Sequence, residues 1–371
     1  MKIREFGVEI WMNAHENDAT FNLAETCVDS ITIAELLTLS GRNDTALADL
    51  LPLRMGYGAI EGSARLKAAI CALYDRQTPE NIIVTHGTIG ANHLVHAALA
   101  GPGDAVVAVV PTYQQHYSIP ESCGAEVRPL WLKPENNFLP DFDELATLAQ
   151  GAKLIALTNP NNPTGALIDR AGLMKIVEIA RANDAWVLCD EVYRGIDQTG
   201  DGFTPSMADL YEKGIATCGM SKAFSLAGLR LGWVAAPPEI IHAVSIHRDY
   251  TTISVGGLDD HFAALALESS DRILDRSRRI TRTNLAILDA WMATQPRLSW
   301  VKPRSGTTAL LRFDLPISSA EFCLRLQADT GVMLLPGSAL DMEGWLRIGY
   351  ACDTDTLRQG LALLGDWLAR A

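Results

Sequence analysis

The chain has 371 residues, of which 48% are hydrophobic and 20% are charged, and its formal net charge at pH 7 is −13. This length and composition predict a folded protein with two packed domains and argue against a disordered chain. An acidic surface repels phosphate backbones, so we expect no nucleic-acid partner.

The cysteines and the apolar runs indicate the cellular compartment of the protein. Seven cysteines are scattered without a C-x-x-C pair, and their odd number favours reduced thiols and a cytoplasmic location over a disulfide framework. The N-terminal stretch MKIREFGVEIW lacks the apolar core of a signal peptide. Runs such as LIALT and WVLCD are strand-sized and far shorter than the roughly 20 residues of a membrane span. We therefore expect no membrane partner, and no metal site is predicted.

In chain order, apolar residues at helical spacing predict a first helix over residues 63–76. Beyond it, short apolar runs alternate with helical patterns. We predict strands over 81–87, 105–110, 125–132, 153–159, 185–191, 215–221 and 231–236, with helices over 91–100 and 168–183. Strands that alternate with helices and lack hairpin turns favour parallel pairing in a doubly wound sheet. Ligands of such sheets bind beyond the carboxyl ends of the strands.

The pattern changes from about residue 285. The later elements are strands over 298–302, 307–313 and 345–349 and helices over 319–330 and 354–369. We predict an α/β protein with a large domain over 46–285 and a smaller α+β domain over 286–371. The N-terminal segment 1–45 is expected to pack with the smaller domain.

Polar residues gather at the predicted strand ends. The groups are His86-Gly87-Thr88, Asn159 to Gly165, Asp190-Glu191 and Ser221-Lys222. Alone, a lysine after a strand is usually a solvated surface residue. However, burying an ammonium is costly, and a desolvated lysine has a lowered pKa that lets it form Schiff bases. Arg230, eight residues on in an apolar segment, requires an anion such as a phosphate.

Three further side chains suit the same chemistry. Asp190 either forms an ordinary cap or ion pair, or faces a pyridinium nitrogen and makes that ring a better electron sink. Tyr193 can donate a hydrogen bond to a phenolic oxygen. Asn162 belongs to a turn sequence, but its amide can reach the same oxygen.

The order NPNNPTG, then DEVY, then SK with an arginine eight residues later resembles the class I/II aminotransferases. These are fold-type I enzymes that depend on pyridoxal 5'-phosphate (PLP). The motifs occur in the family's order, and the resemblance covers about residues 55 to 350. It implies a PLP-dependent transferase fold of type I: a mostly parallel sheet with helices on both faces, plus a smaller α+β domain.

Carried over residue by residue, the resemblance implies that Lys222 holds PLP as a Schiff base and moves the substrate's proton. It implies that Asp190 pairs with the pyridine nitrogen, and that Tyr193 and Asn162 bind the phenolic oxygen. Arg230 would bind the phosphate with its guanidinium fork.

The other implied cofactor contacts come from loops. HGTIGA matches the family's phosphate loop at a helix start, with Gly87, Thr88 and Ile89 in contact with the phosphate. Ser221 precedes the lysine, and Tyr113 in PTYQQHY falls where an aromatic ring stacks on the cofactor.

Two matches concern the partner subunit and the substrate. Tyr57 in GYGAIEG fits the tyrosine that reaches the partner subunit's phosphate, which implies a homodimer with shared active sites. Arg347 in GWLRIGY matches the arginine that clamps the substrate's α-carboxylate. Arg347 could instead be a surface residue on a strand, but its apolar neighbours favour a partly buried position.

The sequence departs from the family at the phosphate loop. Gly219, three residues before the lysine, and Ile89 stand where the family usually has a hydroxyl side chain. We expect Ser221, Ser225 or the loop amides to compensate.

The N-terminal segment departs as well, because NLAETCVDSIT (22–32) replaces a glycine-rich stretch that lines the substrate pocket. Glu25 would lie near the substrate, with Glu9, Asn13 and Glu16 on one face of a preceding helix. This pattern fits either a solvated acidic face or an acidic clamp for a guanidinium. It is similar to PLP enzymes that act on arginine or hydroxyarginine, such as capreomycidine synthases and arginine oxidases.

The resemblance thus implies an aminotransferase that acts on amino-acid and keto-acid substrates. The alternative is a PLP-dependent lyase, oxidase or cyclase of arginine or hydroxyarginine, because the same fold and cofactor residues serve both. A binding module built on a degenerate enzyme is a third hypothesis, which the intact Lys222 disfavours.

Overall fold

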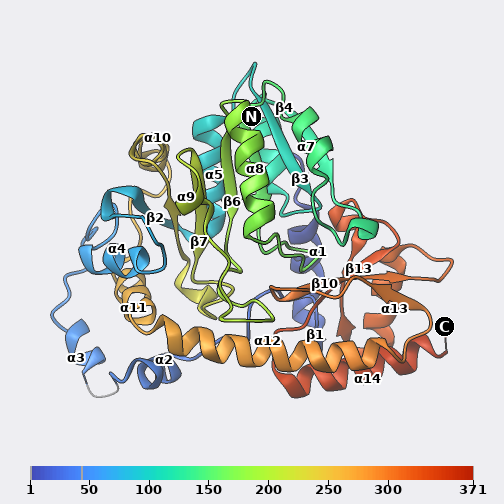
Figure 1. The fold of residues 1–371 in the computed structure, drawn as a ribbon. Coiled ribbons are helices and arrows are strands. Elements are labelled where there is room, and N and C mark those ends of the chain that lie inside the picture. Colours follow the sequence, from blue (N-terminus) through green and yellow to red (C-terminus); the bar gives the residue numbers. More distant parts are fainter. Residues whose placement is uncertain (1, 43–44, 371) are drawn as a thin grey trace.

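The computed structural model describes residues 2–42 and 45–370. Its centre is a twisted sheet with the strand order β2-β8-β7-β6-β5-β3-β4 (Figure 1). The strands are β2 (Ile82–His86), β3 (Ala105–Val110), β4 (Glu126–Trp131), β5 (Leu154–Thr158), β6 (Trp186–Asp190), β7 (Gly214–Gly219) and β8 (Leu231–Ala235). Each lies within a predicted strand or within one residue of it.

The direction of β8 differs from the sequence-based expectation. Neighbouring strands run parallel except at β8, which is antiparallel to both β2 and β7. Only residues 220–230 connect β7 to β8, and a parallel crossover needs about a dozen residues or more. Parallel pairing throughout is therefore wrong at β8, whereas the prediction of a mostly parallel sheet is confirmed.

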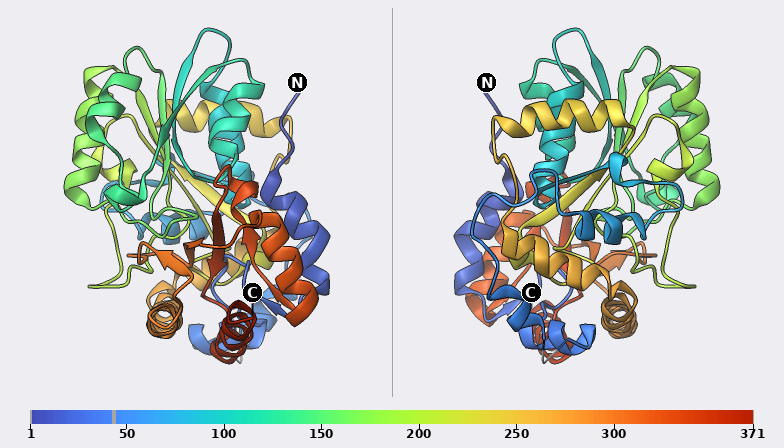
Figure 2. Two further views of the ribbon diagram at one scale, coloured as in Figure 1. Left: turned by 90° about the vertical axis from the view of Figure 1, so that its right-hand side faces the viewer. Right: turned by 90° about the vertical axis from the view of Figure 1, so that its left-hand side faces the viewer.

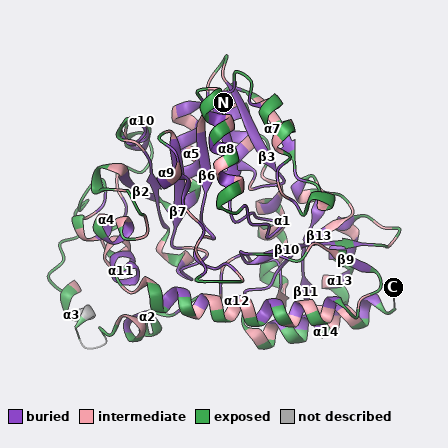
Figure 3. Ribbon diagram, viewed as in Figure 1, coloured by how far each residue is buried: buried purple, intermediate pink, exposed green. Residues whose placement is uncertain are grey.

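Helices cover both faces of this sheet because successive strand residues point to opposite sides. Ile83 packs in one apolar cluster with α5 (Gly87–Leu99) and α10 (Pro238–Asp249). Its neighbours Ile82 and Val84 pack in another, with α4 (Ala64–Cys71) and α11 (Gly257–Leu267). The inner strands β3, β5 and β7 are buried on both faces, whereas the edge strand β4 is largely exposed (Figure 3). The other covering helices are α6 (Gln115–Ser122), α7 (Phe142–Leu148), α8 (Arg170–Ala182) and α9 (Met207–Leu210).

The C-terminal part forms a second, antiparallel sheet with the order β12-β13-β10-β9. Its strands are β9 (Leu298–Trp300), β10 (Thr308–Phe313), β12 (Leu335–Pro336) and β13 (Trp345–Gly349), and its helices are α13 (Ser319–Thr330) and α14 (Thr354–Leu368). The long helix α12 (Ser270–Met292) runs along the base of the molecule and contacts both α11 and α14 (Figures 1 and 2).

The N-terminal segment contacts this C-terminal part. β1 (Phe21–Asn22) pairs in parallel with β11 (Val332–Met333), and α1 (Gly7–His15) contacts η5 (Gly337–Leu340). These contacts support the proposed packing, while the three domain boundaries stay a prediction. The remaining elements are η1 (Glu16–Asp18), α2 (Ile33–Ser40), α3 (Ala46–Leu50), η2 (Pro79–Asn81), η3 (Pro134–Asn136) and η4 (Ala227–Leu229). Within the described ranges, no helix is both long and apolar enough to cross a bilayer.

Two predicted helix bounds are wrong. The helix expected over 63–76 ends at Cys71 in α4, because the Asp209 carboxylate accepts hydrogen bonds from the backbone N–H groups of Asp75 and Arg76 at 2.9 and 3.0 Å. That contact with a distant loop uses donors that a longer helix would need. The helix expected to begin at residue 91 begins at Gly87, directly after β2.

Gly349, at the end of β13, lies unusually close to the N-terminal segment. Its backbone N–H donates to the Leu23 carbonyl at 2.7 Å. A Cβ atom at this position would overlap the carbonyl oxygen of Glu25. The segment that carries Glu25 is therefore packed directly on the backbone of β13.

We expect Gly349→Ala to lower the free energy of unfolding by about 1–3 kcal/mol, because a backbone carbonyl cannot move aside as a flexible side chain can. Gly228→Ala is the matched control, since the space around Gly228 is open, and its effect should stay within about 0.5 kcal/mol. Urea denaturation measures both. Equal stability of the two variants would contradict this close packing.

Candidate functional site

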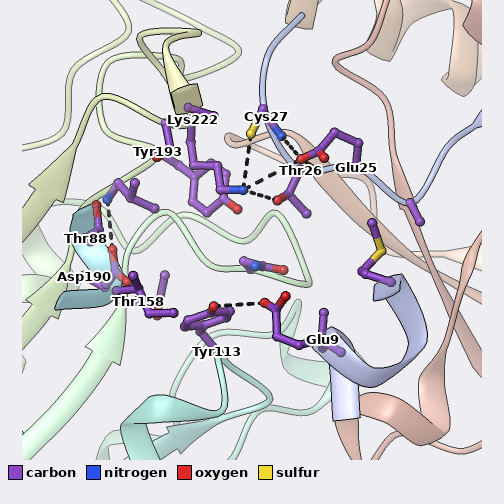
Figure 4. Close-up of a pocket in the computed structure, with 18 of the residues that line it drawn as sticks. Glu9, Glu25, Thr26, Cys27, Thr88, Tyr113, Thr158, Asp190, Tyr193 and Lys222 are labelled. Carbon is purple, nitrogen blue, oxygen red and sulfur yellow. Dashed lines mark hydrogen bonds and ion pairs between the residues drawn. The ribbon is translucent and has the colours of Figure 1, made fainter. Parts of the chain in front are cut away.

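A cavity of about 530 Å³ lies beyond the carboxyl ends of β5, β6 and β7, where α1 and β13 also meet the large sheet (Figure 4). The structure brings most of the predicted site residues to this cavity. Those that line it are Glu9, Asn13, Glu16, Glu25, Thr88, Ile89, Tyr113, Asn162, Asp190, Tyr193, Ser221, Lys222, Arg230 and Arg347. Segments far apart in the sequence thus share one site.

Lys222 points into the cavity toward the N-terminal segment (Figure 4). Its Nζ donates to Thr26 Oγ1 at 2.5 Å and lies 3.4 Å from Cys27 Sγ and 3.8 Å from a Glu25 carboxylate oxygen. Burial alone would lower the pKa of Lys222, but the charges of Cys27, Tyr193 and Glu25 raise it above the usual value. The prediction of a lowered pKa is therefore wrong for the lysine with these neighbours.

Glu25 is the anionic partner of this lysine. Burial would raise the pKa of the Glu25 carboxyl, but the Lys222 ammonium and the backbone N–H groups of Cys27 and Thr26 lower it to about 2. Those N–H groups donate to Oε1 at 2.9 and 2.6 Å. Glu25 is thus a fixed negative charge at the cavity wall.

Asp190, at the end of β6, is buried and its carboxylate is held from two sides. Oδ2 accepts from Asn92 Nδ2 at 2.7 Å, and Oδ1 accepts from the backbone N–H of Val192 at 3.1 Å. Asn92 is fixed in turn by Thr217, whose hydroxyl donates to its Oδ1 at 2.6 Å. A carboxylate so oriented presents its negative charge to the cavity.

Glu191, the second acid of this strand end, turns away from the cavity. Its Oε1 accepts from Ser206 Oγ at 3.0 Å and from the backbone N–H of Met207 at 2.7 Å. Burial raises its pKa to about 7, although Arg194 and these hydrogen bonds oppose the shift. The two acids therefore differ in role although they are adjacent in the sequence.

The start of α5 forms a cradle that suits an anion. Backbone N–H groups in the first turn of a helix have no partner within the helix. The hydroxyl of Thr88 is buried and has no hydrogen-bond partner in the described part of the chain. The Arg230 guanidinium lies 3.1 Å from the position of a Cβ on Gly87. Unsatisfied donors and a guanidinium around one space fit the phosphate of PLP.

The missing hydroxyl at position 219 has a steric reason. A Cβ on Gly219 would overlap the Thr88 hydroxyl, so Thr88 occupies the space of a longer side chain there. Ser221 lines the cavity. Ser225 does not compensate, because it is buried with its hydroxyl 3.4 Å from that of Ser277 and lies outside the cavity lining.

Arg347 lies on β13 and is buried rather than a surface residue. Its Nη2 donates to the Ala24 carbonyl at 2.9 Å, and its Nη1 lies 3.4 Å from Asn162 Oδ1. Burial lowers the pKa of this guanidinium, and its Nε has no partner among the described residues. A buried guanidinium with a spare donor at the cavity fits a carboxylate.

The acidic side chains of the N-terminal segment form one wall of the cavity. Glu9 Oε1 accepts a hydrogen bond from the Tyr113 hydroxyl at 3.1 Å, and the Tyr113 ring packs 4.8 Å from that of Phe6. Glu16 belongs to η1 and not to the helix predicted for it, since α1 ends at His15. It lines the cavity nonetheless.

Tyr57, a predicted site residue, lies outside the lining of this cavity. Its side chain is 70% exposed, and its loop borders a separate surface hollow with residues 252 and 254–256. Gly87 lies at the start of α5, outside the cavity lining.

Among the lining residues that went unpredicted, four carry a polar side chain or a thiol: Thr26, Cys27, Asn92 and Thr158. A usable signal existed for Asn92, because a polar residue at an apolar helix position is usually buried with a specific partner. No local signal marks Thr26 or Cys27. Their contacts with Lys222 join residues 196 and 195 positions apart in the sequence, so they depend on the folded chain.

The sequence profile of the family described as aminotransferase class I and II matches residues 12–364. The chain belongs to this family. The predictions of an aminotransferase-type enzyme, the α/β fold of type I and the PLP cofactor are thereby confirmed.

Similar proteins include both aminotransferases and cyclising enzymes. The chain is 31% identical to capreomycidine synthase of Streptomyces vinaceus over 366 residues. This aligned region covers 97% of this chain and 93% of that protein. A PLP-dependent aminotransferase structure from Streptococcus suis is 42% identical, with a TM-score of 0.96 and coverage of 100% and 99%. The structure of the PLP-dependent cyclase OrfR is 27% identical, with a TM-score of 0.92 and the same coverage.

The raised pKa of Glu191 gives a pH dependence of stability. The folded pKa of about 7 exceeds the ordinary value of 4.5, so the folded protein loses stability as pH rises from 4.5 to 7. We expect Glu191→Gln to match the wild type below that window and to be more stable above it, by about 3 kcal/mol at most. Denaturant titrations across the pH range test this. A stability difference that is independent of pH would contradict it.

Proposed function

We propose that this protein is a PLP-dependent aminotransferase in which Lys222 holds the cofactor and moves the α-proton of an amino acid. The convergence of Lys222, Asp190 and the α5 anion cradle on one cavity carries this proposal. When bound, PLP supplies the electron sink that weakens the bond between Cα and its hydrogen.

The chain's residues supply charge and orientation around the cofactor. We propose that the Asp190 carboxylate faces the ring nitrogen, and that Asn162 and Tyr193 donate to the phenolic oxygen. Arg230 and the first turn of α5, with the Thr88 hydroxyl, would hold the phosphate. Tyr113 would stack on the ring, with its hydroxyl fixed by Glu9.

Arg347 and Lys222 would then act on the substrate. The guanidinium of Arg347 binds the α-carboxylate and so fixes the direction of the Cα–H bond. The Nζ of Lys222, once replaced by the amino group of the substrate, would accept the proton from Cα as a general base and would later donate it as a general acid.

We expect the purified protein to form glutamate from an amino acid and 2-oxoglutarate. Lys222→Ala should lose the cofactor's long-wavelength absorbance and lower kcat by about a hundred- to ten-thousand-fold. Lys302→Ala is the control, because Lys302 is exposed and pairs with Asp289 at 2.6 Å. Ammonia, or a cyclic product that forms without a keto acid, would contradict transamination.

The charge balance of the cavity favours a second candidate: a PLP-dependent lyase, oxidase or cyclase that acts on arginine or hydroxyarginine. Lys222, Arg230 and Arg347 are taken up by the cofactor and the α-carboxylate. The charges left for the substrate's side chain are then Glu9, Glu16 and Glu25. Such a wall attracts a cation and disfavours an acidic side chain. The likeness to a capreomycidine synthase and to a PLP-dependent cyclase supports this candidate.

Charge-removing variants test the acidic wall. With arginine as substrate, we expect Glu9→Gln and Glu16→Gln each to lower kcat/KM by about tenfold or more, because a hydrogen bond to a charged group is lost. With a neutral amino acid, kcat/KM should change little. Glu121→Gln, outside the cavity, is the control. Equal effects on both substrates would remove the cationic-substrate candidate, and product analysis separates a keto acid from a cyclic product.

We also propose a homodimer with shared sites, in which Tyr57 reaches the partner's phosphate. Large apolar side chains are exposed on two adjacent segments: Leu51, Met55, Tyr57 and Tyr250. The segments are joined by a hydrogen bond from Ser254 Oγ to the Tyr57 carbonyl at 3.1 Å. Exposed apolar side chains that cluster in this way are typical of an interface. A cytoplasmic location is proposed as well, and the free thiols of all seven cysteines, each within the described ranges, support it.

A further inference from the structure

Two buried histidines lie behind Asp190, on the side away from the cavity. His96 is on α5 and His116 is on α6, and both are fully buried. Their rings meet edge to face, with His96 Nε2 3.2 Å from His116 Nδ1. The other ring nitrogen of His116, Nε2, lies 3.7 Å from Asp190 Oδ2. The three side chains therefore form a row that ends at the carboxylate.

We propose that His96 is a positioning residue: it holds His116 in the tautomer whose Nε2–H faces Asp190, and so stabilises the negative charge that Asp190 presents to the cofactor. The proposal rests on the role of Asp190 in the proposed function. It assigns a purpose to a buried pair that the cofactor and substrate contacts leave unused.

The tautomer follows from the contact between the two rings. One nitrogen of the 3.2 Å pair must donate and the other must accept. If His96 Nε2–H donates, His116 carries its own proton on Nε2 and turns an N–H toward the carboxylate. In the reverse arrangement, a lone pair of His116 faces the negative charge of Asp190, which is repulsive. Electrostatics therefore selects His96 as the donor.

The surroundings of His96 suit a neutral donor. Burial, together with the nearby charges of His116 and His93, lowers the pKa of His96 well below its usual value. A neutral imidazole has a single N–H, so donation to His116 leaves Nδ1 of His96 without a proton. Among the described residues, Nδ1 of His96 has no hydrogen-bond partner. This fits a nitrogen without a proton, because it has no N–H group to donate.

Helix α5 thereby supports Asp190 twice. Asn92 and His96 are four residues apart and lie on the same helical face. Asn92 donates to Oδ2 directly at 2.7 Å. His96 contacts His116, whose Nε2 lies 3.7 Å from the same oxygen and has no hydrogen-bond partner among the described residues. Helix α5, whose first turn would hold the phosphate, thus also orients the Asp190 carboxylate that would lie beside the ring nitrogen.

Histidine ring NMR of the apoprotein tests the tautomer without involving the cofactor. Long-range 1H–15N spectra, with His116 assigned from a His116→Gln variant, should show His116 protonated on Nε2 and His96 neutral. An Nδ1-protonated His116 would overturn this inference and leave the proposed function intact.

Variants of His96 test the consequence in the holoenzyme. His96→Leu removes the donor, so we expect kcat to fall about tenfold with KM little changed. The pH midpoint of the cofactor's absorbance change should move up by about 0.5–1 unit, because the ring would hold less positive charge. His96→Gln keeps an N–H near the Nε2 position and should restore most of both values. His242→Leu, on the exposed side of α10, is the control.

These measurements distinguish failure of the positioning role of His96 from failure of the proposed function. A wild-type midpoint in His96→Leu, or equal losses in His96→Leu and His96→Gln, would overturn the positioning role. A wild-type midpoint in Asp190→Asn would instead overturn the proposed function, and this inference with it.

Discussion

The parallel alignment of β5, β6 and β7 is the constraint on which the rest of the site depends. Its register places Thr158 and Asp190, the last residues of β5 and β6, beside Thr217, which lies two residues before the end of β7. Thr158 and Asp190 line the cavity, and Thr217 fixes the Asn92 amide that holds Asp190. A shift of one residue would turn these side chains to the opposite face of the sheet.

The site is built by opposing charges across two parts of the chain. The connection between β7 and β8 contributes Lys222 and Arg230, while the N-terminal segment contributes Glu9 and Glu25. The ion pair between Lys222 and Glu25 spans 3.8 Å and joins these parts. Because the pair is partly buried, it is screened less than a surface pair. The same segment packs directly on the backbone of Gly349, so the acidic wall has a rigid support.

Reaction outcome is a separate question from fold and cofactor. The groups that we propose to hold the ring and the phosphate would serve transamination and cyclisation alike, because each reaction begins with loss of the α-proton. The N-terminal segment places Glu25, Thr26 and Cys27 beside Lys222. Selection of substrate and outcome would therefore depend on this segment and not on the sheet.

The sequence by itself determined the α/β fold, the strand ends and the family to which the chain belongs, because short apolar runs and the motifs around Asn162, Asp190 and Lys222 are local patterns. Tertiary structure decided what depends on distant contacts. It ended α4 early through Asp209, reversed β8, and raised rather than lowered the pKa of Lys222 by bringing anionic neighbours to it. Contacts such as those of Thr26 with Lys222 and of His96 with His116 leave no local pattern, since their partners lie on separate elements that only the folded chain brings together.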